Sequence, residues 1–133
     1  MRFLSIYKTA EKNTPPEQEE VTAMIKLIGD MTRAGVLEAT EGCLPSALGA
    51  RVKRSGAKVT VIDGPFTESK ELVAGFALIR TATKADAIEV AKQFLAVAGE
   101  GECELRQIFD ASEAPSKDPT TVRRHLADQF AQK

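Results

Sequence analysis

The sequence has few of the residues that build metal and redox centres. Its 133 residues include no Trp, one Tyr, one His and two Cys. One His and two dispersed Cys do not supply a zinc site, and we find no calcium loop, phosphate-cradling loop, dinucleotide fingerprint or nucleophile elbow. We therefore expect neither a metal nor a cofactor. Cys43 and Cys103 lack CxxC spacing, which favours free thiols in a reducing cytoplasm.

Long apolar runs and an excess of one charge are also missing. No stretch approaches the roughly 20 residues that cross a bilayer, and the N-terminus has the pattern of a strand rather than of a signal peptide. We expect a cytoplasmic protein without a membrane partner. The 18 basic and 19 acidic side chains argue against a nucleic-acid partner, because such binding depends on many Lys and Arg. A local basic cluster is interpreted as an exposed hairpin that charge keeps soluble: Arg51, Lys53, Arg54 and Lys58.

The hydrophobic periodicity predicts one α+β domain followed by a short tail. The order is that of a ferredoxin-like split β-α-β domain with an inserted β-hairpin and an antiparallel sheet. We expect the domain at 1–110, and a linker with a short C-terminal helix at 111–133, starting at Asp118-Pro119. The predicted domain elements are strand 2–9, helix 15–34, strand 36–44, hairpin 50–62, strand 72–81, helix 83–98 and strand 102–109.

Helix boundaries follow from capping residues. Thr14 is expected to cap the first helix, with Pro15 in its first turn and Gly35 at its end. Thr83 is expected to open the second helix. The buried stripes predicted from three- and four-residue spacing are Val21, Met24, Ile25, Ile28 and Met31 in the first helix, and Ile88, Ala91, Leu95 and Ala98 in the second.

Two helices cover only one face of the predicted sheet. We assign Phe3, Tyr7 and Phe76 to the other face, and exposed apolar area of that extent is typical of an association surface. A two-fold pairing of two such faces buries both in one self-complementary interface. We therefore expect a homodimer through the open sheet face.

The segment from Asp63 to Glu71 is the most particular stretch of the sequence, and two interpretations of it stay open. As structure, Asp63, Gly64 and Pro65 form a tight turn and Phe66 plugs one end of the fold. As a site, the carboxylates lie in a cleft, and one acts as an acid or base. The candidate catalytic residues are Asp63, Glu68 and Glu71. The candidate ligand-binding residues are Tyr7, Glu41, Asp63, Gly64, Pro65, Phe66, Lys70 and Arg106.

The nonapeptide 63–71 resembles the signature of the DGPF, or YCII-related, family. Segments 41–45, 75–76 and 104–106 also look like family features. The resemblance implies a dimeric α+β barrel with a cleft near the turn, between the sheet and the dimer partner. In some bacteria, similar proteins are encoded beside extracytoplasmic-function sigma factors, which implies a regulatory partner as an alternative.

The sequence departs from that family at one point. Related YCII proteins carry a first-helix His that has been proposed, with an Asp, as a catalytic pair. The first helix here has no His, and the single His125 is interpreted as a surface residue of the tail. The leading expectation is a homodimer that binds a small molecule at the Asp63–Glu71 turn, with or without turnover. The alternatives are a regulatory or protein-interaction module, for example a partner of a sigma factor, and a cofactor-independent isomerase or monooxygenase.

Overall fold

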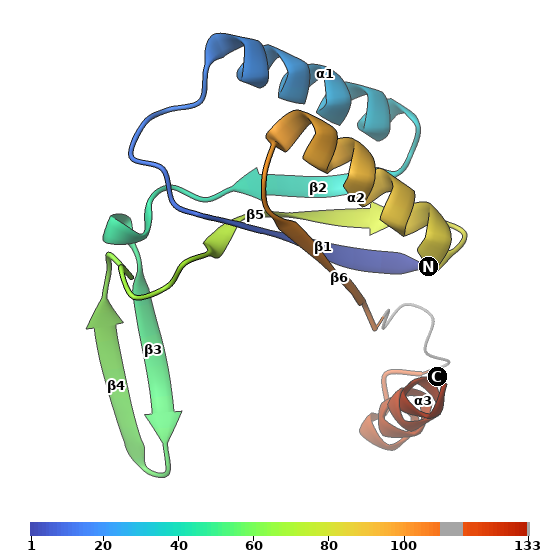
Figure 1. Ribbon diagram of the computed structural model, residues 1–133. Coiled ribbons are helices and arrows are strands. Elements are labelled where there is room, and N and C mark those ends of the chain that lie inside the picture. Colours follow the sequence, from blue (N-terminus) through green and yellow to red (C-terminus); the bar gives the residue numbers. More distant parts are fainter. Residues whose placement is uncertain (110–115, 133) are drawn as a thin grey trace.

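Two helices lie on one face of a four-stranded sheet, and a hairpin and a third helix extend from the other side (Figure 1). The computed structural model describes residues 1–109 and 116–132; the first residues of the predicted linker, 111–115, lie outside that part. The elements are β1 (Arg2–Thr9), α1 (Gln18–Arg33), β2 (Leu37–Gly42), η1 (Ser46–Leu48), β3 (Ala50–Ser55), β4 (Lys58–Asp63), β5 (Leu72–Arg80), α2 (Lys84–Ala98), β6 (Glu102–Gln107) and α3 (Pro119–Ala131).

The sheet has the ferredoxin-like topology. Its strand order is β2-β5-β1-β6, and every neighbouring pair is antiparallel. α1 connects β1 to β2 and α2 connects β5 to β6, so both helices pack on the same face. The predicted α+β fold with its split β-α-β order is therefore confirmed.

The helices cover the face of β1 that was predicted to be open. Phe3 is opposite Ile79 in the sheet, and both are 2% exposed in a core with Ala87 of α2. The Tyr7 ring meets the ring of Phe94 on α2 edge-on, with centroids 5.1 Å apart. Both residues thus lie under the helices, and their predicted place on the open face is wrong. Since both faces of β1 carry apolar residues, alternation alone does not tell which face the helices cover.

The first helix begins later than predicted. α1 starts at Gln18, and Glu17 is its N-cap, in an extended conformation without a side-chain capping bond. Thr14 is therefore not the cap, and Pro15 is not in the first turn. A proline disfavours the α conformation in the residue before it. Because Pro15 precedes Pro16, the helix begins only after the proline pair.

The other predicted helix boundaries are confirmed. α1 ends before Gly35, which has a φ of 75° that glycine adopts without steric cost. Thr83 caps α2, where its side chain accepts a hydrogen bond from the backbone N–H of Asp86. Asp118 caps α3 by accepting from the N–H of Thr121.

The inward stripes are confirmed in part. Met24, Ile28 and Met31 of α1 and Ala91 of α2 face the sheet side as predicted, whereas Val21, Ile25 and Ile88 are exposed rather than buried. A helix with many apolar residues has more than one face that could be buried. Here contact with the sheet decides which face points inward. The residues that face the sheet side are Met24, Leu27, Ile28 and Met31 on α1, and Ala87, Val90, Ala91 and Phe94 on α2.

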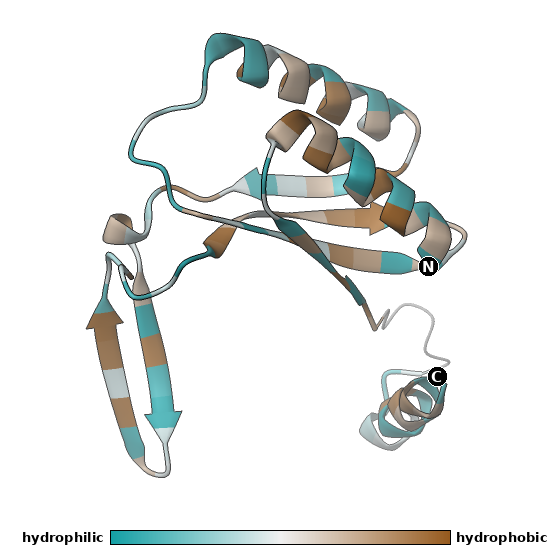
Figure 2. Ribbon diagram, in the orientation of Figure 1, coloured by the Kyte–Doolittle hydropathy of each residue, from teal (hydrophilic) through white to brown (hydrophobic). Residues whose placement is uncertain are grey.

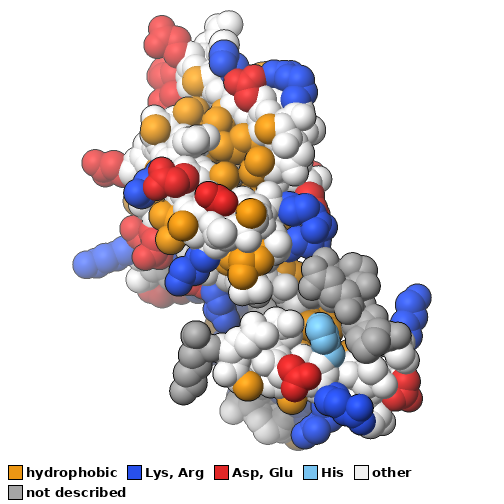
Figure 3. All heavy atoms as spheres, turned by 90° about the vertical axis from the view of Figure 1, so that its right-hand side faces the viewer, with side chains coloured by type: hydrophobic (Ala, Val, Ile, Leu, Met, Phe, Trp, Pro, Cys, Tyr) orange, Lys and Arg blue, Asp and Glu red, His pale blue; other side chains and the backbone are white. Residues whose placement is uncertain are grey.

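The hairpin and the tail stand outside the main sheet. β3 and β4 pair only with each other, around Gly56 at a φ of 60°, and hydrophobic strand residues are visible on them in Figure 2. Figure 3, which views the molecule from the side of α3, shows hydrophobic side chains gathered on the body above that helix. His125 of α3 lies against Phe109, with ring centroids 5.5 Å apart. His125 is half-buried by this contact, and its side chain still reaches the surface (Figure 3).

Candidate functional site

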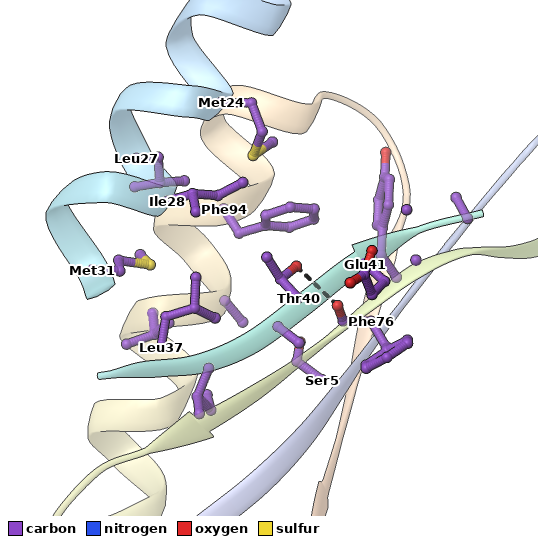
Figure 4. Close-up of a pocket in the computed structure, with 18 residues that line it drawn as sticks. Ser5, Met24, Leu27, Ile28, Met31, Leu37, Thr40, Glu41, Phe76 and Phe94 are labelled. Atoms are coloured by element: carbon purple, nitrogen blue, oxygen red, sulfur yellow. Dashed lines mark hydrogen bonds between the residues drawn. The ribbon is translucent and has the colours of Figure 1, made fainter. Parts of the chain in front are cut away.

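A cavity of about 310 Å³ lies between the helices and the sheet (Figure 4). The labelled side chains of Met24, Leu27 and Phe94 point into it from above, while the Phe76 ring points away on the far side of β5. The space is partly open to solvent, so it is a pocket rather than a sealed void of the interior. Its other apolar lining residues include Ile28, Met31, Leu37, Ile79, Val90 and Ala91.

The hydroxyl groups around this cavity are already hydrogen bonded. The Tyr7 hydroxyl donates to the carbonyl of Glu100 at 2.7 Å, and Thr40 Oγ1 donates to the carbonyl of Phe76 at 2.9 Å. Ser5 bonds to the Cys103 thiol, and burial raises the pKa of that thiol. The cavity therefore offers an apolar wall with few free polar groups, and such a wall suits an apolar ligand.

A wider, more polar groove of about 740 Å³ adjoins the cavity. The two share Tyr7 and Ala74 as lining residues. The groove is bounded by the loop 10–17 and by segments 43–45 and 72–74. Its lining includes Leu72, which directly follows the Asp63–Glu71 turn, and Pro45, which precedes the Ser46 that contacts Phe66 of the turn. No residue of 63–71 itself lines the groove.

The first half of the turn is held by backbone contacts with η1. The N–H of Gly64 donates to the carbonyl of Gly49 at 3.0 Å, and the N–H of Phe66 donates to Ser46 Oγ at 3.1 Å. Glu11 accepts from both the N–H and the hydroxyl of Ser46. These contacts explain Gly64 and Phe66 without a ligand, in agreement with the structural interpretation of the turn.

The second half of the turn is organised around Arg51 of the hairpin. Its guanidinium lies 3.9 Å from the centroid of the Phe66 ring and donates to Glu68 at 2.6 Å and to Ser69 at 3.2 Å. The backbone N–H of Glu68 itself and Arg51 both lower the pKa of the Glu68 carboxyl. Glu68 is thus held as a carboxylate, which does not suit the role of a proton donor at neutral pH.

The remaining candidate residues fall into two separate places. Asp63 and Glu71 are exposed, and their side chains form no hydrogen bond or close ion pair with any residue that the structure describes. Tyr7 and Glu41 line the cavity. Arg106 lies on the open face of the sheet, where it is paired with Glu104 at 3.4 Å. The structure therefore groups the turn residues, separates Arg106 from them, and adds a helix-lined cavity that the turn does not line.

Sequence reasoning missed most of the cavity residues. Leu27, Val90 and Phe94 line it, yet the predicted stripes did not include them. The sequence does carry a pattern at these positions. Val90 and Phe94 lie four residues apart on α2, with the small side chains of Ala87 and Ala91 beside them. A pattern of large and small residues on one helix face indicates packing, and only the positions of α1 and the sheet turn it into a cavity.

The open face of the sheet has an apolar centre bordered by ion pairs. Leu4, Ile6, Phe76 and Leu78 are neighbours in the register of β1 and β5. Glu38 accepts from Arg2 at 2.9 Å and from Arg80 at 2.8 Å, and Lys8 donates to Glu104 at 2.8 Å. Arg2 is the first cause of the lowered pKa of Glu38, as Lys8 is for Glu104. The sheet therefore has an open apolar face of the kind predicted for association, although Phe3 and Tyr7 are not part of it.

Metal-ligating side chains are dispersed. Within residues 1–109 and 116–132, no three His, Cys, Asp or Glu side chains gather in an arrangement that could hold a metal ion. In the same part of the chain, no helix has the length and apolar character needed to cross a membrane. Both cysteines are free thiols, as predicted.

Fold and cavity together define the class: a ferredoxin-like α+β protein with an apolar space between its helices and sheet. The family follows from comparison. The YCII-related domain family model matches residues 1–112, and the chain belongs to that family. The resemblance carried by the nonapeptide 63–71 is thereby confirmed. No curated protein matches the chain at a significant level.

Proposed function

We propose that this protein is a homodimer that binds a small, largely apolar molecule between the helices and the sheet. The observation that carries the proposal is the cavity of about 310 Å³, whose walls are apolar and whose hydroxyls are already engaged. Ligand sites in proteins commonly measure roughly 300–1,000 Å³, and most of their lining is hydrophobic. Met24 and Met31 let the wall adapt to different shapes, since Met side chains are flexible.

The Asp63–Glu71 turn forms the outer end of the proposed site. Its support is Leu72, which lines the groove and directly follows the turn, so that a polar end of the ligand in the groove would extend toward Asp63, Lys70 and Glu71. If the protein also catalyses a reaction, Asp63 or Glu71 is the acid or base, because Glu68 is engaged by Arg51.

Homodimer formation is proposed through the open sheet face. Its support is the apolar centre around Leu4, Ile6, Phe76 and Leu78, which α1 and α2 leave uncovered. A two-fold pairing of these faces places the charged border of one copy beside that of the other. The end of the Asp63–Glu71 turn then lies at the rim of the interface, because Leu72, which follows it, pairs with Thr9 at the end of β1.

A larger side chain in the cavity is expected to weaken the binding of an apolar ligand. Ala91→Leu adds three carbons to a residue of α2 that is 8% exposed and lines the cavity. The affinity for N-phenyl-1-naphthylamine, a neutral fluorescent probe, should fall at least about tenfold, a change of about 1.4 kcal/mol in binding free energy. The matched control is Ala96→Leu, an exposed position of the same helix outside the cavity. Equal probe affinity in both variants would rule out the cavity as the site.

A second probe tests the part played by the turn. In the double variant Asp63→Ala, Glu71→Ala, removal of two negative charges should strengthen binding of the anionic probe 1-anilinonaphthalene-8-sulfonate. The expected gain is about two- to fivefold, because exposed charges interact by no more than ~1 kcal/mol. The neutral probe should bind as it does to the unchanged protein. If the affinity of the anionic probe does not change, the turn does not border the site.

A regulatory module with a protein partner, such as a sigma factor, is the second candidate. The observation in its favour is Phe130 of α3, which is 82% exposed. Removing residues 111–133 should abolish capture of such a partner in a pull-down with purified proteins and leave binding of the neutral probe intact. Loss of probe binding in the truncated protein would instead assign the tail to the small-molecule site.

A further inference from the structure

The β3–β4 hairpin exposes an apolar face that its own domain does not cover. Val52 is opposite Val61, and Val59 is opposite Arg54, so the three valines share one face of the ribbon. Val52 is 68% exposed, Val61 is 63% exposed and Val59 is 59% exposed. The other face carries Arg51, whose guanidinium packs on Phe66 at the base of the hairpin. The contact at the base therefore leaves the valine face open.

An isolated two-stranded ribbon is at best marginally stable in water. β3 and β4 pair only with each other, which leaves both outer edges of the ribbon without strand partners. In Figure 1 the hairpin extends from the sheet on the side away from α1 and α2, the side of the open face. A body that covers the open face therefore also lies beside the hairpin.

The size of the open face gives a second reason. Four strands about 4.8 Å apart, each with about six paired residues at 3.3 Å per residue, present roughly 400 Å². The face of the hairpin adds roughly 200 Å² by the same arithmetic. A partner that covers both surfaces therefore covers about one and a half times the area of the sheet face alone, and a large contact area is typical of a stable interface.

The charges of the two surfaces are complementary where the valine face meets the open face. Arg54 lies on the valine face, opposite Val59, and forms no ion pair with any residue that the structure describes, whereas Lys53 and Lys58 lie on the other face of the ribbon. The border of the open face carries Glu71 and Glu102, which surround Lys8 without a close ion pair to it in the described residues. Opposite charges on facing patches guide and orient association. Arg54 of one copy therefore matches the acidic border of another.

We propose that the β3–β4 hairpin is an arm that clasps a second copy of this chain. The valine face, formed by Val52, Val59 and Val61, packs on the partner, and Arg54 on the same face of the hairpin lies beside the partner's acidic border. The inference rests on the proposed homodimer and goes beyond it, because it makes the hairpin a required part of the interface. It also gives a reason for an inserted hairpin that contributes nothing to the core of its own domain.

A charge placed on the valine face should weaken the dimer. In Val61→Asp, the dissociation constant of the dimer, measured by sedimentation equilibrium, should rise at least tenfold. The matched control is Thr60→Asp, the neighbouring residue on the opposite face, where the new carboxylate lies across from Lys53; its constant should change less than twofold. A monomeric unchanged protein would overturn both the homodimer and the arm. A dimer that Val61→Asp leaves intact would overturn the arm alone.

Hydrogen exchange in the unchanged protein tests the same inference without a substitution. The amides of 50–63 should be protected above the dissociation constant of the dimer and exchange at least tenfold faster below it, while those of β1 and β5 change little. Protection of the hairpin that does not depend on protein concentration would show that the ribbon is stable without a second copy, and would overturn the proposal.

Discussion

Gly64→Ala should lower the stability of the protein by about 3 kcal/mol, at the upper end of the range for overpacked sites. A Cβ at this position would lie 1.7 Å from the carbonyl oxygen of Ser46, and 2.6 Å from its carbonyl carbon. The neighbour is backbone, which cannot rotate away as a side chain would. Relief requires the turn and η1 to separate, which breaks the hydrogen bond from the N–H of Gly64 to Gly49. We expect a fall in the melting temperature of about 10 °C.

Gly42→Ala is the matched control, since a Cβ there meets nothing within 4 Å and its φ is not in the left-handed region. Its stability should stay within about 0.5 kcal/mol of that of the unchanged protein, as for most surface substitutions. Equal melting temperatures for the two variants would show that η1 does not pack against the turn as described. The same result would weaken the structural interpretation of the nonapeptide.

Phe3→Ala should cost about 3–5 kcal/mol of unfolding free energy, the range for a fully buried Phe. Phe3 is 2% exposed and packs with Ile79 and Ala87 under α2. The measurement is urea unfolding at a protein concentration low enough to keep the chain monomeric. This variant decides between the two assignments of β1, because a Phe on the open face would lose little in a monomer.

Phe76→Ala provides the comparison on that open face. Phe76 is 37% exposed, and its ring points away from the helices. In the monomer, Phe76→Ala should lower the free energy of unfolding by less than half as much as Phe3→Ala. The dissociation constant of the dimer should be higher than that of the unchanged protein. Equal costs in the monomer would mean that α1 and α2 cover the other face of the sheet.

Local sequence signals were sufficient for most of the fold. Strand alternation, the Ser55-Gly56-Ala57 turn, Thr83 and Gly35 each act within a few residues, and the elements lie where these signals predicted them. The start of α1 was the exception. There two local rules compete, since a proline suits a first turn but also restricts the residue before it, and the second rule prevailed at Pro15-Pro16.

The candidate site was predictable only in part. The nonapeptide 63–71 identified the family and the turn, because its order is unusual whatever surrounds it. The cavity has no such signature, because its residues are ordinary apolar side chains from five separate elements. Leu27 and Phe94 become lining residues only through the distance and rotation of α1 and α2 above the sheet.

By itself, the sequence determined the order of the elements, the tight turn and membership of the YCII-related family, because each depends on neighbouring residues. Tertiary structure alone decided that Phe3 and Tyr7 lie under the helices, that a cavity separates α1 from the sheet, and that the valines of the hairpin are left bare. The physical reason is that burial depends on which surfaces meet across the chain, and a strand with two apolar faces or a helix with two apolar stripes satisfies its local rules in either orientation.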